Sequence, residues 1–318
     1  DGEDRSVLSM LAALLTTVAL APGLRTAAHA VYHLRDAPTI FRSAPNLEDL
    51  TNTRIPRCGG GAIQAAVARP SQLPGDDRPL KVMILLHEFF GLTESIVEKA
   101  QAYADELQCV CIAPDTFRGV TTTFIPRAIW LALSTPQERV NDDLNDVLAW
   151  ADEQPGIDST RPAVLGFCYG GGKALRYTTQ VRPDAATVVF YGNPLTNAED
   201  FTSLRAPVCG IFGTQDPQIP QALVDKFRAA LEEAGVEHEV VSYYGVGHAF
   251  WKDVGQVERE EMPQVAAWRL TTNFLRNHFQ GKESFARKRA FLEYMLQEQA
   301  ARDAAGEEAE PEETDEDL

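Results

Sequence analysis

Short apolar runs alternate with longer amphipathic segments between Ile63 and Phe279. Runs of this kind are typical of buried strands, whereas apolar residues that recur every three or four positions predict helices. Because the two kinds alternate, the pattern predicts an α/β fold with a mostly parallel sheet and helices on both faces. The expected strands are Leu80–Leu86, Val110–Ala113, Ala163–Leu165, Thr187–Tyr191, Val208–Phe212 and Glu239–Tyr244. The expected helices are Glu94–Leu107, Pro136–Glu153, Gly170–Gln180, Gln221–Ala234 and Met262–Phe279.

One cysteine lies in a glycine frame between an expected strand and an expected helix. The frame is Gly166–Gly171, with the sequence Gly-Phe-Cys-Tyr-Gly-Gly, and the cysteine is Cys168. This strand–turn–helix setting is that of a nucleophile elbow, with sulfur in place of the usual serine oxygen. The glycines avoid collisions with the adjoining strand and helix, and a helix N-terminus favours a thiolate. The alternative for Cys168 is a buried structural thiol.

An acid and a histidine follow the cysteine in the order of an α/β-hydrolase triad. Asp216 comes just past the expected strand at Val208–Phe212, and His248 follows the next expected strand. The spacings of 48 and 32 residues leave room for one helix–strand unit between the acid and the histidine. Taken singly, Asp216 is compatible with an ordinary turn before a proline and His248 with a loop histidine. Together they predict that Cys168 attacks a carbonyl, His248 moves its proton and Asp216 orients the imidazole.

The loop after the strand Leu80–Leu86 is expected to complete the site. In an α/β-hydrolase, this loop gives one backbone N–H of the oxyanion hole and the residue after the nucleophile gives the other. We therefore expect Phe89 and Tyr169 to be the two donors. Glu88 precedes Phe89 in an apolar stretch, where a buried carboxylate is costly unless it has a partner. The partner is either the thiol or local amides.

Five motifs follow one another along the chain: His87-Glu88-Phe89-Phe90-Gly91, Ala113-Pro114-Asp115, Gly166-Phe167-Cys168-Tyr169-Gly170-Gly171, Phe190-Tyr191-Gly192 and Gly247-His248-Ala249-Phe250. With these motifs in this order, the chain resembles the dienelactone hydrolases from roughly Ile63 to Phe279. The resemblance implies an α/β-hydrolase domain with a Cys-His-Asp triad. It also implies that Glu88 contacts the nucleophile, holds the thiol until substrate moves it, and then accepts its proton.

Substrate recognition departs from the family's pattern. Members that act on true dienelactones bind the substrate carboxylate with arginines, one of them four residues past the catalytic histidine. Lys252 holds that place here, and Arg118 lies near the place of another. A lysine pairs with a carboxylate but not through a bidentate fork. Trp251 and Trp130 are candidates for an apolar pocket wall, while solvated surface cations and core tryptophans are the alternatives.

The composition indicates a folded enzyme that needs no cofactor. The chain has 318 residues, of which 44% are hydrophobic, and five cysteines without a CxxC pair or zinc-type spacing. We therefore expect reduced thiols, no metal and no cofactor. The net charge is −17, and the sequence shows neither a basic patch for nucleic acid nor a glycine loop with the lysine that binds phosphates.

Four segments are expected along the chain: an N-terminal apolar segment and linker at 1–61, the hydrolase-like domain at 62–280, a C-terminal helix at 281–302 and an acidic tail at 303–318. The tail has nine acidic and no basic residues, which favours disorder. Val7–Leu24 is uncharged, and a membrane anchor, a cleavable signal and a packed helix all stay open for it. Asp36–Gly61 is rich in Pro, Arg, Asn and Gly and is expected to be a linker.

Two classes of function follow from the sequence. The first is a thiol hydrolase that opens a lactone or small ester through an acyl-thioester on Cys168. The second is a catalytically silent subunit with the same fold, which binds a membrane or a larger protein assembly through its termini. The triad favours the enzyme. The compartment stays open: one that keeps thiols reduced is expected, and an organelle, either a chloroplast or a mitochondrion, with membrane association is a candidate. The oligomeric state stays open as well.

Overall fold

The computed structural model describes residues 46–281, except residues 74, 76 and 77. The expectations for Val7–Leu24, for the C-terminal helix beyond Gly281 and for the acidic tail therefore lie outside the described residues. Within the described ranges, no helix is both long enough and apolar enough to span a membrane.

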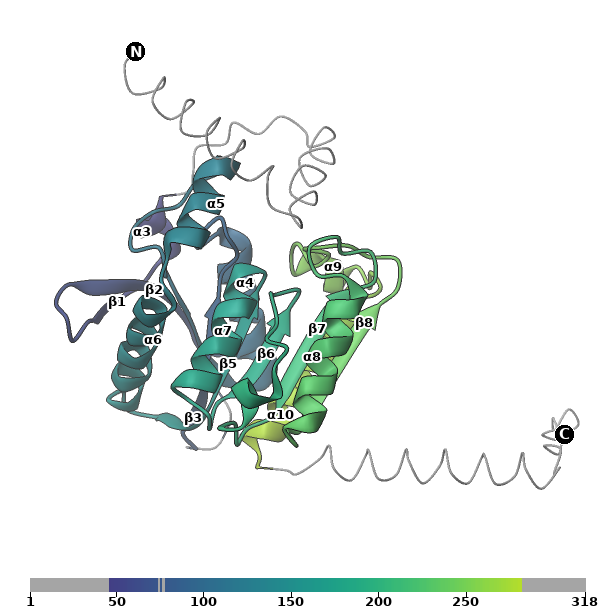
Figure 1. Cartoon of the computed structure of the whole chain (residues 1–318). Helices are drawn as coiled ribbons and strands as arrows, with labels where there is room; N and C mark the ends of the chain where they lie inside the picture. The colour runs from purple at the N-terminus through teal and green to yellow at the C-terminus, as the bar shows by residue number, and fades with distance from the viewer. Residues whose placement is uncertain (1–45, 74, 76–77, 282–318) are drawn as a thin grey trace, which may run out of the picture.

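The described part of the chain forms one sheet with the strand order β1-β2-β4-β3-β5-β6-β7-β8 (Figure 1). The strands from β3 to β8 pair in parallel, and only the pairs β1–β2 and β2–β4 are antiparallel. The predicted mostly parallel sheet is confirmed. The strands are β1 Thr53–Pro56, β2 Ala62–Ala68, β3 Leu80–Leu86, β4 Cys109–Pro114, β5 Ile157–Phe167, β6 Ala186–Phe190, β7 Val208–Gly213 and β8 His238–Tyr243.

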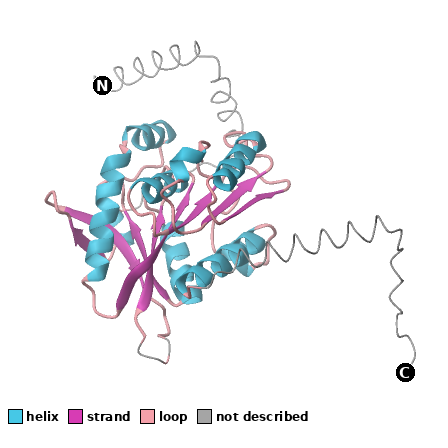
Figure 2. Cartoon of the chain, turned by 60° about the horizontal axis from the view of Figure 1, so that its bottom comes forward, coloured by secondary structure: helices cyan, strands magenta, loops and turns pink. Residues whose placement is uncertain are grey.

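Helices cover both faces of this sheet (Figure 2). Alternate residues of β3 point to opposite faces, so Leu85 packs with Tyr103 of α4 and Phe274 of α10, while Ile84 packs with α6 and α7. Helix α8 covers the end of the sheet at β7. The helices are α3 Leu47–Leu50, α4 Glu94–Leu107, α5 Ile125–Ser134, α6 Gln137–Asp152, α7 Tyr169–Gln180, α8 Gln221–Glu233, α9 Gly255–Glu258 and α10 Gln264–Phe279, with a 3₁₀ turn at Ala198–Phe201.

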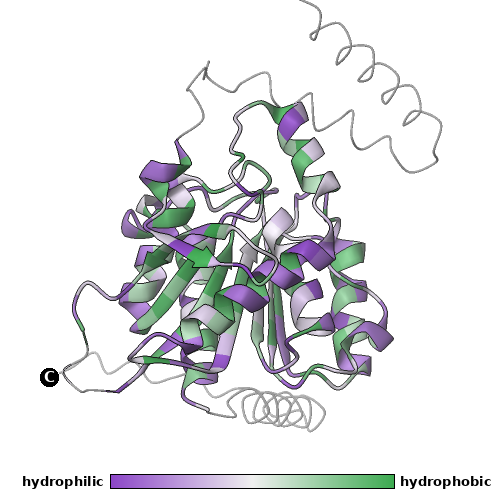
Figure 3. Ribbon diagram, turned by 90° about the vertical axis from the view of Figure 1, so that its left-hand side faces the viewer, coloured by the Kyte–Doolittle hydropathy of each residue, from purple (hydrophilic) through white to green (hydrophobic). Residues whose placement is uncertain are grey.

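The core lies between the sheet and these helices. Figure 3 shows apolar colour concentrated on the strands, with polar colour on the outward sides of the helices. Buried strands of this kind carry apolar side chains on both faces, which is why they appear in the sequence as continuous apolar runs. The expected strand Leu80–Leu86 and the expected helix Glu94–Leu107 match β3 and α4 at both ends.

The predicted linker Asp36–Gly61 is wrong in its second half. Helix α3 and strand β1 lie in it, and β1 pairs with β2 at the edge of the sheet. Ile55 is the only fully buried side chain of β1, since its neighbours alternate toward solvent. The folded unit therefore begins before residue 62, the boundary expected from the sequence.

Candidate active site

Cys168 lies at a strained turn between β5 and α7. Its φ of 50° and ψ of −113° fall in a region that non-glycine residues rarely adopt. The turn is held by a hydrogen bond of 2.9 Å from the Cys168 N–H to the Phe190 carbonyl. A Cβ atom at Gly166 would overlap the backbone of Gly170, and one at Gly170 would lie 2.5 Å from the Leu86 carbonyl oxygen. The close approach of strand and helix therefore requires these glycines.

The three residues of the expected triad form one hydrogen-bonded chain. The Cys168 Sγ lies 3.1 Å from His248 Nε2, and His248 Nδ1 lies 2.7 Å from Asp216 Oδ2. Asp216 is 3% exposed, and its Oδ1 accepts hydrogen bonds from the N–H groups of Gln218 and Ile219. Because the carboxylate holds the proton at Nδ1, Nε2 is the nitrogen that faces the sulfur.

The loops that carry Asp216 and His248 are joined to each other. The N–H of Gln215 donates to the carbonyl of Val246 at 2.9 Å, one residue before Asp216 and two before His248. A Cβ atom at Gly213 would overlap that same carbonyl, so a glycine at the end of β7 permits the approach. The histidine is therefore placed against the acid by backbone contacts as well as by its own side chain.

His248 is more basic than an ordinary histidine. Its burial disfavours the charged imidazolium, but the hydrogen bonds and charges of Asp216 and Cys168 outweigh this and raise the pKa of His248 to about 10. A charged imidazolium beside a cysteine sulfur is the setting in which cysteine nucleophiles react as thiolates.

Glu88 follows β3 and is half-buried beside the triad. Its Oε1 accepts a hydrogen bond of 3.3 Å from the Tyr191 hydroxyl. Burial raises the pKa of Glu88, while Lys99, Tyr191 and His248 act in the opposite direction. In the described part of the chain, Glu88 and Cys168 share no hydrogen bond. The hydrogen-bond partner of the Cys168 sulfur is His248 instead.

Lys99 is a site residue that the sequence patterns do not reveal. It is 2% exposed, and its Nζ donates to Ser95 Oγ at 2.8 Å and to the Lys252 carbonyl at 2.7 Å. The ammonium also lies 5.1 Å from the Phe167 ring centroid. Burial lowers the pKa of Lys99 to about 8, against the attraction of Glu88. A lysine on an amphipathic helix normally faces solvent, so its position gives no sequence signal.

The two expected oxyanion-hole residues border the same cavity as Cys168. Tyr169 is the first residue of α7, a position whose N–H has no carbonyl partner within its helix. Phe89 lies in the loop after β3, and hydrogen bonds of the His87 side chain hold this loop in place. The His87 Nε2 accepts the N–H of Thr116 at 3.2 Å, so its Nδ1 donates to the Glu88 carbonyl at 2.7 Å. Burial lowers the pKa of His87, which keeps this imidazole neutral.

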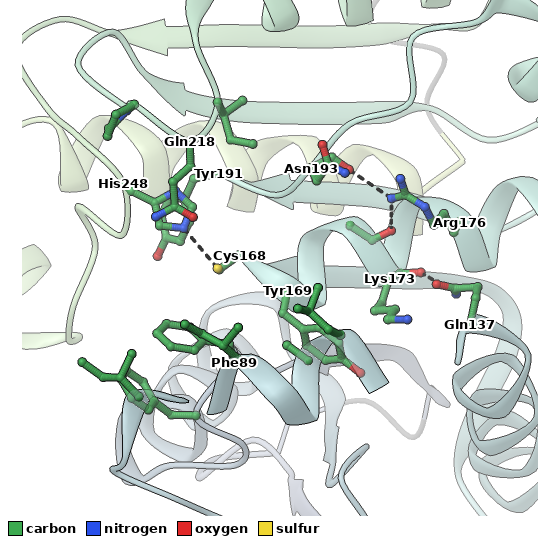
Figure 4. Close-up of a pocket in the computed structure, with 18 residues that line it drawn as sticks. Phe89, Gln137, Cys168, Tyr169, Lys173, Arg176, Tyr191, Asn193, Gln218 and His248 are labelled. Carbon is green, nitrogen blue, oxygen red and sulfur yellow. Dashed lines mark hydrogen bonds between the residues drawn. The ribbon is translucent and has the colours of Figure 1, made fainter. Parts of the chain in front are cut away.

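A cavity of about 920 Å³ opens over the sulfur (Figure 4). Its walls are mostly apolar and include Phe89 and Phe90 together with Ile125, Ile129 and Leu133 of α5. No helix was expected at α5, whose residues fall between two predicted elements. The cavity is large enough for a small organic substrate and is of the kind that binds one.

The three expected substrate-binding residues do not line this cavity as the structure describes it. Lys252 is exposed, Arg118 forms a two-pronged ion pair with Asp143, and Trp251 is 1% exposed within the core. Trp130 is 64% exposed on α5 and is also absent from the lining. The cations that do line the cavity are Lys173 and Arg176 of α7, which local sequence patterns did not single out.

A parallel sheet with a nucleophile elbow after β5, an acid after β7 and a histidine after β8 defines an α/β-hydrolase. Comparison with known proteins gives the family. Residues 63–279 match the Dienelactone hydrolase family, and the chain belongs to that family. It is thereby a hydrolase of carboxylic esters or lactones.

Relatives and a solved structure agree with this assignment. A "Putative carboxymethylenebutenolidase" of Salmonella typhimurium is 33% identical over 231 residues, covering 68% of this chain and 83% of the relative. A protein of the same name from Escherichia coli K12 is 34% identical over 215 residues, covering 63% and 77%. The crystal structure of a "Putative Dienelactone Hydrolase" from Klebsiella pneumoniae has a TM-score of 0.58 at 30% identity, covering 68% of this chain and 95% of that one.

Proposed function

We propose that the protein is a thiol hydrolase in which Cys168, His248 and Asp216 open a lactone or a small ester through an acyl-thioester. The observation that carries this proposal is the hydrogen-bonded chain from sulfur to imidazole to carboxylate, with distances of 3.1 Å and 2.7 Å, beneath an apolar cavity. The order of the partners and their roles are those that nucleophilic acyl transfer requires.

In the acylation step, the Cys168 thiolate attacks the substrate carbonyl carbon, and the carbonyl electron pair moves onto its oxygen. The backbone N–H groups of Phe89 and Tyr169 stabilise that oxyanion. When the intermediate collapses, the carbon–oxygen bond to the alcohol breaks, and the His248 imidazolium gives its proton to the departing alkoxide. In a lactone, that alcohol stays attached to the acyl group.

In the deacylation step, neutral His248 takes a proton from a water molecule, whose oxygen attacks the thioester carbonyl. The carbon–sulfur bond breaks, and the product acid leaves Cys168 as a thiolate beside the restored imidazolium. Asp216 stabilises the charged imidazole in both steps without taking its proton.

Glu88 has a place in the same proposal. We keep from the family resemblance the part in which Glu88 accepts the proton of the Cys168 thiol, which leaves the thiolate that attacks the substrate. A carboxyl group whose pKa is raised by burial is a stronger base than an exposed one, which supports this role. Tyr191, which bonds both Glu88 and the Trp251 carbonyl at 3.3 Å, orients the carboxylate.

The names of the relatives support a lactone among the substrates. A carboxymethylenebutenolidase acts, by its name, on a lactone that bears a carboxylate. We propose the broader class for this chain, because Lys252 and Arg118, the counterparts of the expected carboxylate ligands, lie away from the cavity lining. A silent subunit that works through its termini finds no support in the family match, and those segments lie outside the described residues.

The test is hydrolysis of p-nitrophenyl butyrate and of a dienelactone by the wild type and by Cys168→Ala. We expect the variant to lose roughly 10³-fold or more of kcat/KM while keeping the circular dichroism spectrum and melting temperature of the wild type. Mass spectrometry of acid-quenched wild type should show the acyl group on Cys168. A folded Cys168→Ala protein that turns over at the wild-type rate would overturn the proposal.

A further inference from the structure

The cavity wall beyond Cys168 carries positive charge that the triad does not use. The chain has a net charge of −17, yet the described residues that line the cavity include, besides His248 of the triad, the two cations Lys173 and Arg176 and no aspartate or glutamate. Figure 4 shows both cations on the side of Cys168 away from His248. A site that selects positive charge in so acidic a chain points to an anionic substrate.

The position of these cations sets the distance between the anion and the reacting carbonyl. Lys173 and Arg176 lie five and eight residues after Cys168, and both are in α7. A helix rises 1.5 Å per residue, which separates the Cα atoms of Cys168 and Arg176 by about 12 Å along the axis. The Arg176 guanidinium reaches back by one turn to the Gly172 carbonyl, so the charge itself lies between one and two turns from the nucleophile. This separation favours a substrate whose carboxylate lies away from the reacting carbonyl over one whose carboxylate lies next to it.

Arg176 is held in place through one nitrogen of its guanidinium, Nη1. It is half-buried, and its Nη1 donates to the carbonyls of Gly172 at 2.9 Å and Asn193 at 3.1 Å. No ion pair to Arg176 is found within the described part of the chain, although Asp200 acts on its pKa from a longer distance. A guanidinium fixed through one nitrogen keeps the rest of its fork for a carboxylate.

Lys173 contributes positive charge to the cavity, but its ammonium is already hydrogen-bonded within the protein. Its Nζ already donates to the Thr135 carbonyl at 2.8 Å, at the C-terminal end of α5, and burial lowers its pKa. We therefore expect Arg176 to form the direct contact and Lys173 to strengthen the local potential.

An apolar wall lies along the same cavity. Ile129 and Leu133 of α5 line it together with Phe89 and Phe90, and they are 47% and 80% exposed. Large apolar side chains left exposed at a cavity mark a binding surface for apolar groups. The cavity therefore combines three features: the reactive sulfur of Cys168, the cation of Arg176 and an apolar surface.

We propose that the substrate class is an amphipathic anion: an ester or lactone with an apolar body and a carboxylate between one and two helical turns from the scissile carbonyl, bound by Arg176. This inference rests on the proposed function of Cys168 and adds the specificity of the same site. It moves carboxylate recognition from the positions of Arg118 and Lys252 to α7.

The test compares p-nitrophenyl hydrogen azelate, whose free carboxylate lies far from the ester, with its methyl ester. p-Nitrophenyl hydrogen succinate and its methyl ester give the short pair. For the wild type we expect kcat/KM to be about tenfold or more higher for the azelate than for its methyl ester, through KM, with no such preference in the succinate pair. In Arg176→Gln the ratio of kcat/KM between the azelate and its methyl ester should fall toward one, and Arg176→Lys should keep part of the preference.

Arg269→Gln, at an exposed position on α10, is the matched control for the loss of one positive charge and should keep the full preference. Calorimetric binding of 9-oxodecanoate and of its methyl ester to Cys168→Ala gives a readout that needs no turnover. Equal kcat/KM values and equal affinities for charged and neutral ligands, or a preference for the anion that survives in Arg176→Gln, would overturn the inference. If the neutral esters are cleaved through Cys168 but no anion preference exists, only the inference fails. If binding prefers the anion but Cys168→Ala cleaves esters as fast as wild type, only the proposed hydrolytic mechanism fails.

Discussion

At the scale of single residues, the charge of Glu88 depends on Lys99. Burial raises the pKa of Glu88, and the nearby ammonium partly offsets that effect. Replacing the lysine by methionine removes the cation, so the pKa of Glu88 should rise further and the carboxylate should be protonated over a wider range of pH. If Glu88 accepts the thiol proton, the acid limb of kcat/KM should move to higher pH by roughly one unit in Lys99→Met.

The pH dependence of Lys99→Met provides an internal control. Because the pKa of Lys99 is about 8, the wild type and Lys99→Met should converge above that pH, where the lysine is itself neutral. Asp253 and Glu98 also face Lys99 and contribute to its charge. Lys99→Arg should keep the acid limb of the wild type, and Glu88→Gln should abolish the effect of removing Lys99. A loss of rate that is uniform across pH would instead assign Lys99 to holding the Lys252 carbonyl.

The triad could be predicted from the sequence because each of its members lies in a local motif at the end of an apolar run. Tyr191 lies in one of the family motifs, but nothing local assigned it a contact with Glu88. Lys99 and Arg176 have no local signal, since helix periodicity places a cation on an outward face by default. Their burial depends on how α4 and α7 pack on the sheet, and the sequence of one helix does not predict this packing.

At the scale of elements, the junction of β5 and α7 depends on backbone contact that only glycine permits. A Cβ atom at Gly170 would lie 2.5 Å and 2.6 Å from the carbonyl oxygens of Leu86 and His87, which are backbone atoms of β3 and its loop. We expect Gly170→Ala to destabilise the fold by about 1–3 kcal/mol and to reduce kcat by displacing Cys168. Urea unfolding and initial rates measure the two effects.

Gly172→Ala is the matched control on the same helix. Its nearest neighbour would be the end of the Arg176 side chain at 3.3 Å, followed by the Asn193 carbonyl at 3.4 Å. Inside a helix, alanine is favoured over glycine by about 1 kcal/mol, so we expect this variant to be at least as stable as the wild type. Equal stability losses in the two variants would show that the elbow does not depend on close backbone approach.

The same scale shows where sequence patterns failed. The apolar runs predicted the strands from β3 to β7, since each has a buried apolar stretch that no polar residue interrupts for long. Strand β8, at the edge of the sheet, was also expected although it is only partly buried. Strand β1 contributes a single buried residue, Ile55, and was taken for part of a linker. Helix α5 has only Ala128 and Leu131 buried, because its other apolar side chains face the cavity and solvent, so it lacks the one-sided pattern of a core helix.

At the scale of the whole molecule, buried histidines with opposite pKa shifts limit stability on both sides of neutral pH. The pKa of His248 is raised to about 10, so its contribution to stability is present below the unfolded value of about 6.5 and is lost as the pH rises toward 10. His87 and His278 are shifted downward by burial and act in the opposite sense. We expect the free energy of unfolding to be highest near neutral pH.

His278 of α10 allows the acid side of this behaviour to be tested. It is 5% exposed, its Nε2 donates to the Pro162 carbonyl at 3.1 Å, and burial together with the charge of Arg161 lowers its pKa to about 4. The unfolded chain therefore binds the extra proton between about pH 6.5 and pH 4, and stability falls by about 3 kcal/mol across that window. In His278→Gln, which keeps a donor for Pro162, the slope of unfolding free energy against pH should decrease by up to about 1.4 kcal/mol per pH unit in urea titrations. An unchanged slope would mean that His278 is protonated equally in the folded and unfolded chain, and that the burial of α10 against β5 is looser than the structure shows.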